Sequence, residues 1–196
     1  MAKRGGPLEL AVLGLLHETP MHGYELRKRV SALLGWGRVL SYGSLYPCLK
    51  QMQRVGWLTE DSQPAVKASR RKIVYKLTAE GKERFETMMS SAGPSAWDDD
   101  AFGVHFAFFG RTDAETRMRI LEGRRTRLEE KLERVRASFA RTRERVDAYT
   151  LELQRHAQES VEREVSWLTD LIDDERSRHS PTVRGRRRTP TKKNEK

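Results

Sequence analysis

The sequence predicts a mainly α-helical protein with a small two-stranded β-hairpin in its N-terminal half and a long antiparallel helical arm at its C-terminal side. Apolar residues recur at helical spacing through most of the chain. Residues 73–77 are instead rich in β-branched and aromatic residues, which is typical of a strand. No proline occurs between Thr112 and Pro181, so long helices can run there without interruption.

The two ends of the chain carry the positive charge. The formal net charge of the 196 residues is +10. Residues 1–91 hold 15 Lys and Arg against 8 Asp and Glu, residues 92–180 hold 16 against 19, and residues 181–196 hold 7 against 1. A basic first unit suits a polyanionic partner, and a mildly acidic second unit suits self-association.

Two helices are expected first. Leu8 to His17 is apolar almost all round, as in a helix that neighbours cover on every side, and it is too short to span a bilayer. The second helix is expected from His22 to Leu34, with Tyr24 and Lys28 on the face that points away from the core. Its core stripe consists of Leu26, Val30, Leu33 and Leu34.

A third helix is expected to follow Ser41-Tyr42-Gly43-Ser44, with Gly56 as its C-terminal stop. Proline is best tolerated in the first helical turn, so Pro47 favours Ser44 as the N-cap. Leu45, Leu49 and Met52 form the core face. The opposite face and its borders hold Gly43, Ser44, Tyr46, Pro47, Lys50, Gln51 and Arg54.

A hairpin and a fourth helix follow. Trp57 to Thr59 and Ile73 to Leu77 are the expected strands, and the tip between them is basic, with Lys67, Arg70, Arg71 and Lys72. Thr78 is the expected cap of a helix that returns Phe85, Met88 and Met89 to the core.

Residues 92–111 are interpreted as a linker with a short helix, Asp98 to Gly110. Thr112 and Glu115 match a capping box that opens the helical arm, residues 112–180. The apolar heptad pattern shifts past Leu153, which favours a turn between Arg141 and Thr150, and one continuous helix is the alternative. The expected dimerisation residues are Leu121, Leu128, Leu132, Val135, Phe139, Val165, Leu168 and Ile172. Residues 181–196 form a basic tail without an apolar pattern, expected to be disordered.

This order, three helices, a two-stranded wing and a fourth helix, is that of a winged helix-turn-helix domain over residues 1–91. In that layout the third helix enters the major groove, where Ser and Gln bond to base edges while Lys50 and Arg54 neutralise phosphates. The basic wing tip adds further phosphate contacts. A solvated helix face also carries Lys and Arg, so the case depends on two basic surfaces lying on consecutive elements.

The sequence also resembles the PadR-type winged-helix regulators over residues 8–89. The matching segments are Leu10 to Leu16, His22 to Leu26, Tyr42 to Lys50 ending in Gly56, and Arg71-Lys72 through Tyr75, Leu77, Thr78 and Gly81. The resemblance implies a homodimer on a pseudo-palindromic operator, usually a repressor, released by a small ligand or stress signal. It also implies that Tyr24 contacts phosphate, that Ser41 to Tyr46, including Tyr42, start the groove-facing helix, and that Arg70 to Lys72 are wing contacts. The long second unit resembles the larger branch of the family in architecture.

No cofactor or enzymatic activity is expected. The single cysteine, Cys48, excludes a disulfide within one chain and fits a reducing cytoplasm. Its spacing from His17 and His22 fits no zinc pattern, and no catalytic motif is present. Cys48 is a redox sensor or a small core residue. Four aromatic residues at helical spacing are core or a pocket for a small-molecule effector: Trp97, Phe102, Phe106 and Phe109.

Double-stranded DNA and a second copy of the chain are therefore the expected partners, and no membrane is. The alternatives are a coiled-coil scaffold that binds protein and an architectural DNA binder that works through the basic tail. Titration of a promoter fragment at several salt concentrations separates the regulator from the scaffold, and deletion of residues 181–196 separates it from the architectural binder.

Overall fold

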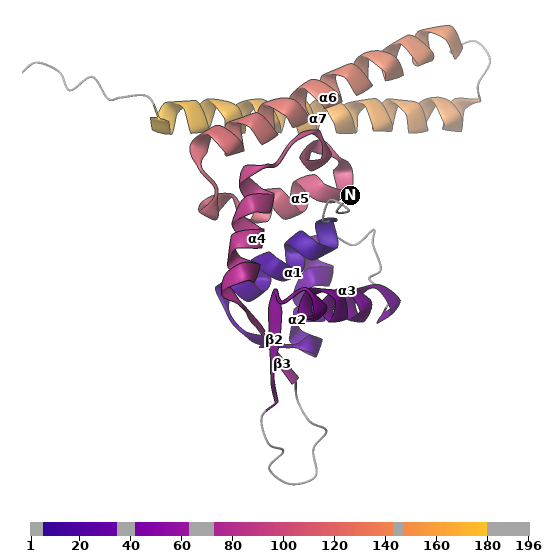
Figure 1. The fold of residues 1–196 in the computed structure, drawn as a ribbon. Coiled ribbons are helices and arrows are strands. Elements are labelled where there is room, and N and C mark those ends of the chain that lie inside the picture. The colour runs from indigo at the N-terminus through magenta and orange to yellow at the C-terminus, as the bar shows by residue number, and fades with distance from the viewer. Residues whose placement is uncertain (1–5, 35–41, 63–72, 143–146, 180–196) are drawn as a thin grey trace, which may run out of the picture.

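The computed structural model describes residues 6–34, 42–62, 73–142 and 147–179. The mainly helical fold with a small β-sheet is confirmed, with a winged helix at one end and a long helical hairpin at the other (Figure 1). The elements in chain order are α1 (Pro7–Glu18), β1 (Met21–His22), α2 (Gly23–Leu34), α3 (Tyr42–Arg54), β2 (Leu58–Ser62), β3 (Ile73–Leu77), α4 (Ala79–Ser90), η1 (Pro94–Trp97), α5 (Asp99–Ala107), η2 (Phe109–Arg111), α6 (Ala114–Thr142) and α7 (Ala148–His179).

The sheet has three antiparallel strands in the order β1-β3-β2, one more than the predicted wing. β2 and β3 form the expected hairpin, with Leu58 opposite Leu77. The added strand is β1, in which Met21 lies opposite Tyr75. Helix α2 consequently begins at Gly23 and not at His22. A strand of two residues is too short to show the alternation that identifies strands in a sequence.

The predicted start of α3 was wrong. The helix begins at Tyr42, so Ser44 lies inside it and Pro47 is its sixth residue. Because Pro47 has no N–H, it leaves the carbonyl of Gly43 without its partner four residues on. Only one bond near the helix start is lost, so proline is tolerated here one turn later than we expected.

Helix α1 is the centre of the first core. Every residue from Leu10 to Leu16 is buried, and Phe85 and Met89 of α4 pack in the same cluster. Thr78 caps α4 as predicted, because its side chain accepts a hydrogen bond from the Gly81 N–H. A Cβ on Gly14 would lie 2.2 Å from the ring of Phe108, so only glycine lets Phe108 dock on α1.

The segment between α4 and α6 connects both cores. Val104 and Phe108 belong to the first core, whereas Ala96 and Phe102 belong to a second core. Most other residues of the second core come from α6 and α7, which form a helical hairpin. A Cβ on Gly123 would lie 2.1 Å from the Trp97 ring, so η1 packs against α6 as closely as Phe108 packs against α1. Residues 92–111 are therefore packed between the winged helix and the α6–α7 hairpin, and we call this segment the wedge.

Helices α6 and α7 pack antiparallel along their lengths, as the hairpin interpretation predicted (Figure 1). Three ion pairs between the helices show that they run antiparallel, because the residue number rises along α6 while it falls along α7. The pairs are Arg117 with Glu175, Arg124 with Glu164, and Arg136 with Glu162. None of the helices in the described ranges is both long and apolar enough to cross a membrane.

The capping box predicted for α6 was wrong. The helix begins one residue after Asp113, whose carboxylate accepts a hydrogen bond from the Thr116 N–H at 2.7 Å. This bond lowers the pKa of Asp113. Thr112 instead donates its hydroxyl to the Phe108 carbonyl at 3.1 Å. Asp and Thr are both good caps, so two adjacent candidates leave the start ambiguous by one residue.

Candidate nucleic-acid interface

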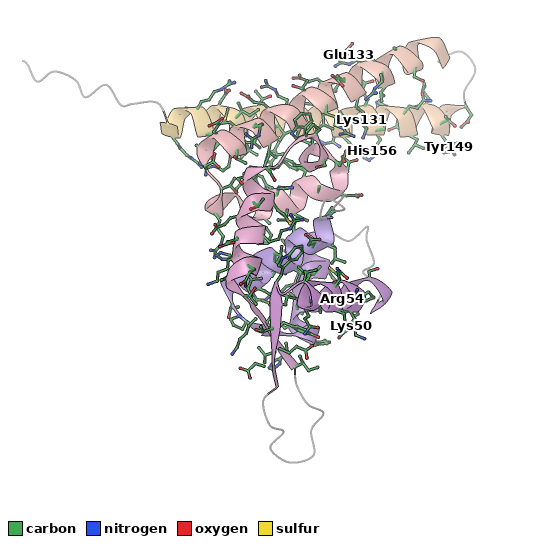
Figure 2. All side chains as sticks on the ribbon, in the orientation of Figure 1. Lys50, Arg54, Lys131, Glu133, Tyr149 and His156 are labelled. Atoms are coloured by element: carbon green, nitrogen blue, oxygen red, sulfur yellow. The ribbon has the colours of Figure 1, made fainter. Side chains whose placement is uncertain are left out.

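Helix α3 separates a core face from a polar face. Leu45, Leu49 and Met52 are fully buried, as predicted. Lys50, Gln51 and Arg54 are exposed, and neither Lys50 nor Arg54 pairs with a carboxylate among the described residues. Figure 2 shows both basic side chains on α3, at the end of the molecule far from the hairpin. Two such cations on one helix face are available to a polyanion.

Helix α2 carries two further exposed polar side chains. Tyr24 is 77% exposed, and Lys28 is exposed and has no carboxylate partner in the described part of the chain. Both side chains therefore lie where the sequence placed them, on the face of α2 opposite Leu26 and Val30.

Tyr46 has a structural role beside any contact with DNA. It is 36% exposed, and its phenol oxygen lies 3.6 Å from where a Cβ on Gly23 would be. Tyr75 of β3 approaches the same point at 3.3 Å. Gly23 thus lets two tyrosines close over the start of α2, and this contact joins α2, α3 and the sheet.

Several predicted interface residues lie outside the described residues. Ser41 and the whole basic tip of the wing do so, namely Lys67, Arg70, Arg71 and Lys72. For Tyr42 and Gly43 the structure describes the helical backbone only. Ser44 is exposed, one turn into the helix. The described portion of the predicted interface thus consists of α2 and α3.

Most predicted dimerisation residues are buried within a single chain. Leu121, Leu128, Leu132, Leu168 and Ile172 all lie in the second core. Val165 packs against that core, Val135 is half-buried, and the side chain of Phe139 lies outside the described set. The heptad pattern therefore corresponds to the seam between α6 and α7 of one chain. The exposed apolar residues of the arm are others: Tyr149, Leu153 and Trp167.

The aromatic residues predicted as a pocket fill space with each other. Phe106 lies 5.0 Å from Phe109 and 5.8 Å from Phe102 between ring centroids. Trp167 of α7 closes the group at 5.4 Å from Phe106. Trp97 packs against the same core, and its indole nitrogen is buried without a hydrogen-bond partner among the described residues. The pattern of these four residues thus reflects packing between α5 and the hairpin.

Cys48 does not have the environment of a reactive thiol. Its side chain is half-buried, and its sulfur lies 3.8 Å from that of Met52. Burial, reinforced by the charge of Glu9, raises the pKa of the thiol to about 11. A thiol with this pKa is protonated at neutral pH, whereas redox-sensing cysteines are thiolates. No group of His, Cys, Asp and Glu in the described ranges could hold a metal ion.

One buried polar residue was not predicted. His105 of α5 is 8% exposed, and its Nδ1 has no hydrogen-bond partner in the part of the chain that the structure describes. The sequence did not indicate that His105 is buried. Helix α5 is apolar on more than one face, so its spacing does not show which face is the core. It lines a cavity between α5 and the winged helix.

Residues 12–87 match the model of the transcriptional regulator PadR-like family. A solved structure of Bacillus subtilis PadR with operator DNA has 20% identity and a TM-score of 0.42, and covers 86% of this chain and 98% of that one. A PadR-like regulator from Bacillus cereus has 20% identity and a TM-score of 0.39, covering 87% and 99%. A Thermoplasma acidophilum protein assigned as a transcriptional regulator has 36% identity and a TM-score of 0.34, covering 40% and 70%. The comparison with curated proteins gave no match.

Proposed function

Since the chain belongs to the PadR-like family of transcriptional regulators, we propose that it binds a specific double-stranded operator as a homodimer and represses transcription until a small molecule or stress signal releases it. The observation that carries the proposal is the polar face of α3. There Lys50 and Arg54 lie without a carboxylate partner among the described residues, opposite a fully buried apolar face. Tyr24 and Lys28 of α2 add to this surface.

In this proposal α3 lies in the major groove. Gln51 and Ser44 bond to base edges, while Lys50, Arg54, Lys28 and Tyr24 contact phosphates on either side. The basic residues of the wing tip extend the phosphate contacts along the duplex.

DNA binding tests this assignment directly. An operator is selected from a random duplex pool, and its affinity for the full chain is measured at several salt concentrations. Lys50→Ala and Arg54→Ala should each weaken binding about tenfold, the effect of losing one charge-assisted contact of about 1.4 kcal/mol. Each should also reduce the salt slope by about one ion.

Lys131→Ala is the matched control, because Lys131 is an exposed lysine on α6, far from α3 (Figure 2). It should leave affinity and slope unchanged. Equal affinity for the selected operator and for random DNA would contradict the proposal. Binding lost on deletion of residues 181–196 would favour the architectural alternative.

The homodimer is proposed to form through the exposed apolar residues of α7. Tyr149 is 90% exposed and Leu153 is 67% exposed, which is unusual for large apolar side chains. Tyr149→Lys should therefore raise the dimer dissociation constant at least about tenfold in sedimentation equilibrium. Ser166→Lys is the control, because Ser166 is exposed on the same helix but lies on a different face from Tyr149 and Leu153. A monomeric wild-type chain would overturn this part.

Repression and release are read from a reporter gene placed behind the selected operator. Deleting the regulator should raise reporter output, whereas a fall would make the chain an activator. Candidate effectors are then those compounds that raise the output only when the regulator is present.

A further inference from the structure

The wedge, residues 92–111, connects the winged helix to the α6–α7 hairpin. Among the described elements, α1 and α2 both pack against α5 of the wedge, and α6 packs against η1 of the wedge. Figure 1 shows α5 between α1 and the hairpin. The angle between the winged helix and the hairpin therefore depends on how firmly the wedge is held on each side.

The winged helix holds the wedge through the ring of Phe108. This ring is buried in the first core and meets the ring of Phe85 edge-on, with 5.4 Å between the two centroids. It also lies so close to Gly14 of α1 that a Cβ there would be 2.2 Å away. Thr112 donates its hydroxyl to the Phe108 carbonyl at 3.1 Å and so fixes the chain that follows. The ring has no room to shift along α1, because the core around it is close-packed.

Four arginines of α6 hold the wedge on the side of the hairpin. They attach it at its start, near its middle and at its end: Arg119 to the carbonyls of Ser90 and Ala92, Arg124 to the Trp97 carbonyl and to Asp99, Arg127 to Asp98, and Arg117 to the Thr112 carbonyl. The four arginines span residues 117–127, which is about 15 Å of helix. A segment attached at three separate places along a helix cannot rotate on that helix without breaking at least one attachment.

Arg124 has the central place among the four. Its side chain is only 7% exposed. One of its nitrogens donates to the Trp97 carbonyl at 2.7 Å and to the Asp99 carboxylate at 2.6 Å. The other two donate to Glu164 of α7, at 2.6 and 3.0 Å. The guanidinium also lies over the ring of Phe102, 5.2 Å from its centroid. Because a guanidinium is a planar fork that fixes direction as well as distance, Arg124 of α6 holds η1, α5 and α7 in one arrangement.

We propose that the wedge is a rigid joint and that Arg124 and Phe108 are positioning residues, which fix the angle between the winged helix and the hairpin and thereby the half-site spacing of the operator. The spacing step rests on the proposed binding of a homodimer to DNA. When two chains associate through their hairpins, this angle in each chain sets the distance between the two α3 helices. A flexible linker would let each winged helix reach its half-site separately, whereas a rigid joint demands one separation.

The geometry of the duplex makes the expected preference steep. One added base pair moves a half-site by about 3.4 Å along the duplex and turns it by about 35° around the axis. A rigid dimer fits both half-sites at one spacing only. Wild-type affinity should therefore fall at least about tenfold when one base pair is inserted between the selected half-sites or removed from between them.

The first test measures the affinity of the full chain for four duplexes: the selected operator, the same operator with one base pair more or one fewer between its half-sites, and a single half-site. Arg124→Met should reduce the preference for the selected spacing to less than about threefold and leave the affinity for the single half-site unchanged. A variant that is merely less stable would bind all four duplexes more weakly. Phe108→Leu keeps an apolar side chain on Gly14 without the ring contact, and it should reduce the preference in the same direction.

Arg124→Met should fold, because the carboxylates that it releases reach water: 33% of the Glu164 side chain and 70% of the Asp99 side chain are exposed. Arg136→Met is the matched control. Arg136 is also an arginine of α6, but its carboxylate partners in the described part of the chain belong to α6 and α7 and not to the wedge. This control should keep the wild-type preference. An unchanged preference in Arg124→Met, or an equal reduction in Arg136→Met, would overturn the assignment.

The second test needs no DNA. Lys82→Cys on α4 and Glu130→Cys on α6 place spin labels at two exposed positions, one on the winged helix and one on the hairpin. The labelled chain carries Cys48→Ala and is diluted with unlabelled chain, so that double electron–electron resonance measures the distance within one chain. The joint with Arg124 in place should give one narrow distribution of distances, and Arg124→Met should widen it at least about twofold. A broad distribution with Arg124 in place would overturn the rigid joint.

The two tests distinguish this inference from the proposed function. A narrow distribution that Arg124→Met widens, in a chain for which no operator can be selected, would support the joint and overturn both the proposed DNA binding and the spacing role. Specific operator binding with the same spacing preference in the wild type and in Arg124→Met would support the proposed DNA binding and overturn the positioning role.

Discussion

Replacing Arg117 with methionine is expected to lower the free energy of unfolding by about 3 kcal/mol, the order found when one partner of a buried ion pair is removed. Arg117 of α6 donates two hydrogen bonds to Glu175 of α7, at 2.9 and 3.1 Å, and also bonds to the Thr112 carbonyl. The Glu175 side chain is only 11% exposed. The exposed Arg178 lies 3.4 Å from the same carboxylate.

Urea unfolding of the full chain measures the loss, and two variants test its cause. Arg117→Met with Glu175→Leu should recover most of the stability, because an apolar pair needs no compensation for a buried charge. Arg155→Met removes two exposed pairs within α7, those with Glu152 and Glu159, and should cost less than about 0.5 kcal/mol. A loss for Arg117→Met as small as for Arg155→Met would show that Glu175 is hydrated in solution.

The helices and their core faces could be predicted from the sequence because apolar spacing is a local property. Leu45, Leu49 and Met52 are buried on α3, and Thr78 caps α4, as the pattern indicated. The exposure of Tyr24, Lys28, Lys50 and Arg54 follows from the same spacing. Local spacing alone was therefore enough to predict the polar face of the candidate interface.

What the sequence could not decide depends on contacts between distant segments. Strand β1 exists because Met21 meets Tyr75, and a two-residue strand has no periodicity of its own. The heptads of the arm predicted a seam, but an apolar stripe is the same whether its partner is α7 of one chain or a second chain. In the structure, Leu121 of α6 and Leu168 of α7 are buried in the same core of one chain.

The cavity that His105 lines was missed for the same reason. Its wall combines residues from Pro7 to His105, and nothing in the local sequence marks them as neighbours. The aromatic residues drew attention because they are large and regularly spaced, yet regular spacing is what packing produces. A single buried imidazole without a partner is detectable only after the fold places α5 against α1 and α4.

The stability of the wild-type chain is expected to fall by about 3 kcal/mol between pH 7 and pH 4 because of His105 alone. Burial lowers the pKa of His105 from 6.5 to about 4 in the folded state. Below pH 6.5 the unfolded chain takes up a proton at this imidazole while the folded chain does not, so acid favours unfolding. The free energy of unfolding is therefore highest above pH 6.5, decreases as the pH falls, and levels off below pH 4. A difference of about 2.5 pKa units corresponds to about 3 kcal/mol.

Urea titrations at pH 7.5, 6.5, 5.5 and 4.5 measure the effect, with His105→Phe and His156→Phe as comparisons. His105→Phe should lose this part of the pH dependence and should be at least as stable as the wild type at pH 7.5, because it replaces an unpartnered buried nitrogen with carbon. His156→Phe should follow the wild-type curve. The carboxylate of Asp99 does not account for a loss in this range: its hydrogen bond to Arg124 lowers its pKa, so its protonation destabilises the fold only at lower pH. Parallel curves for wild type and His105→Phe would mean that water reaches the imidazole in solution.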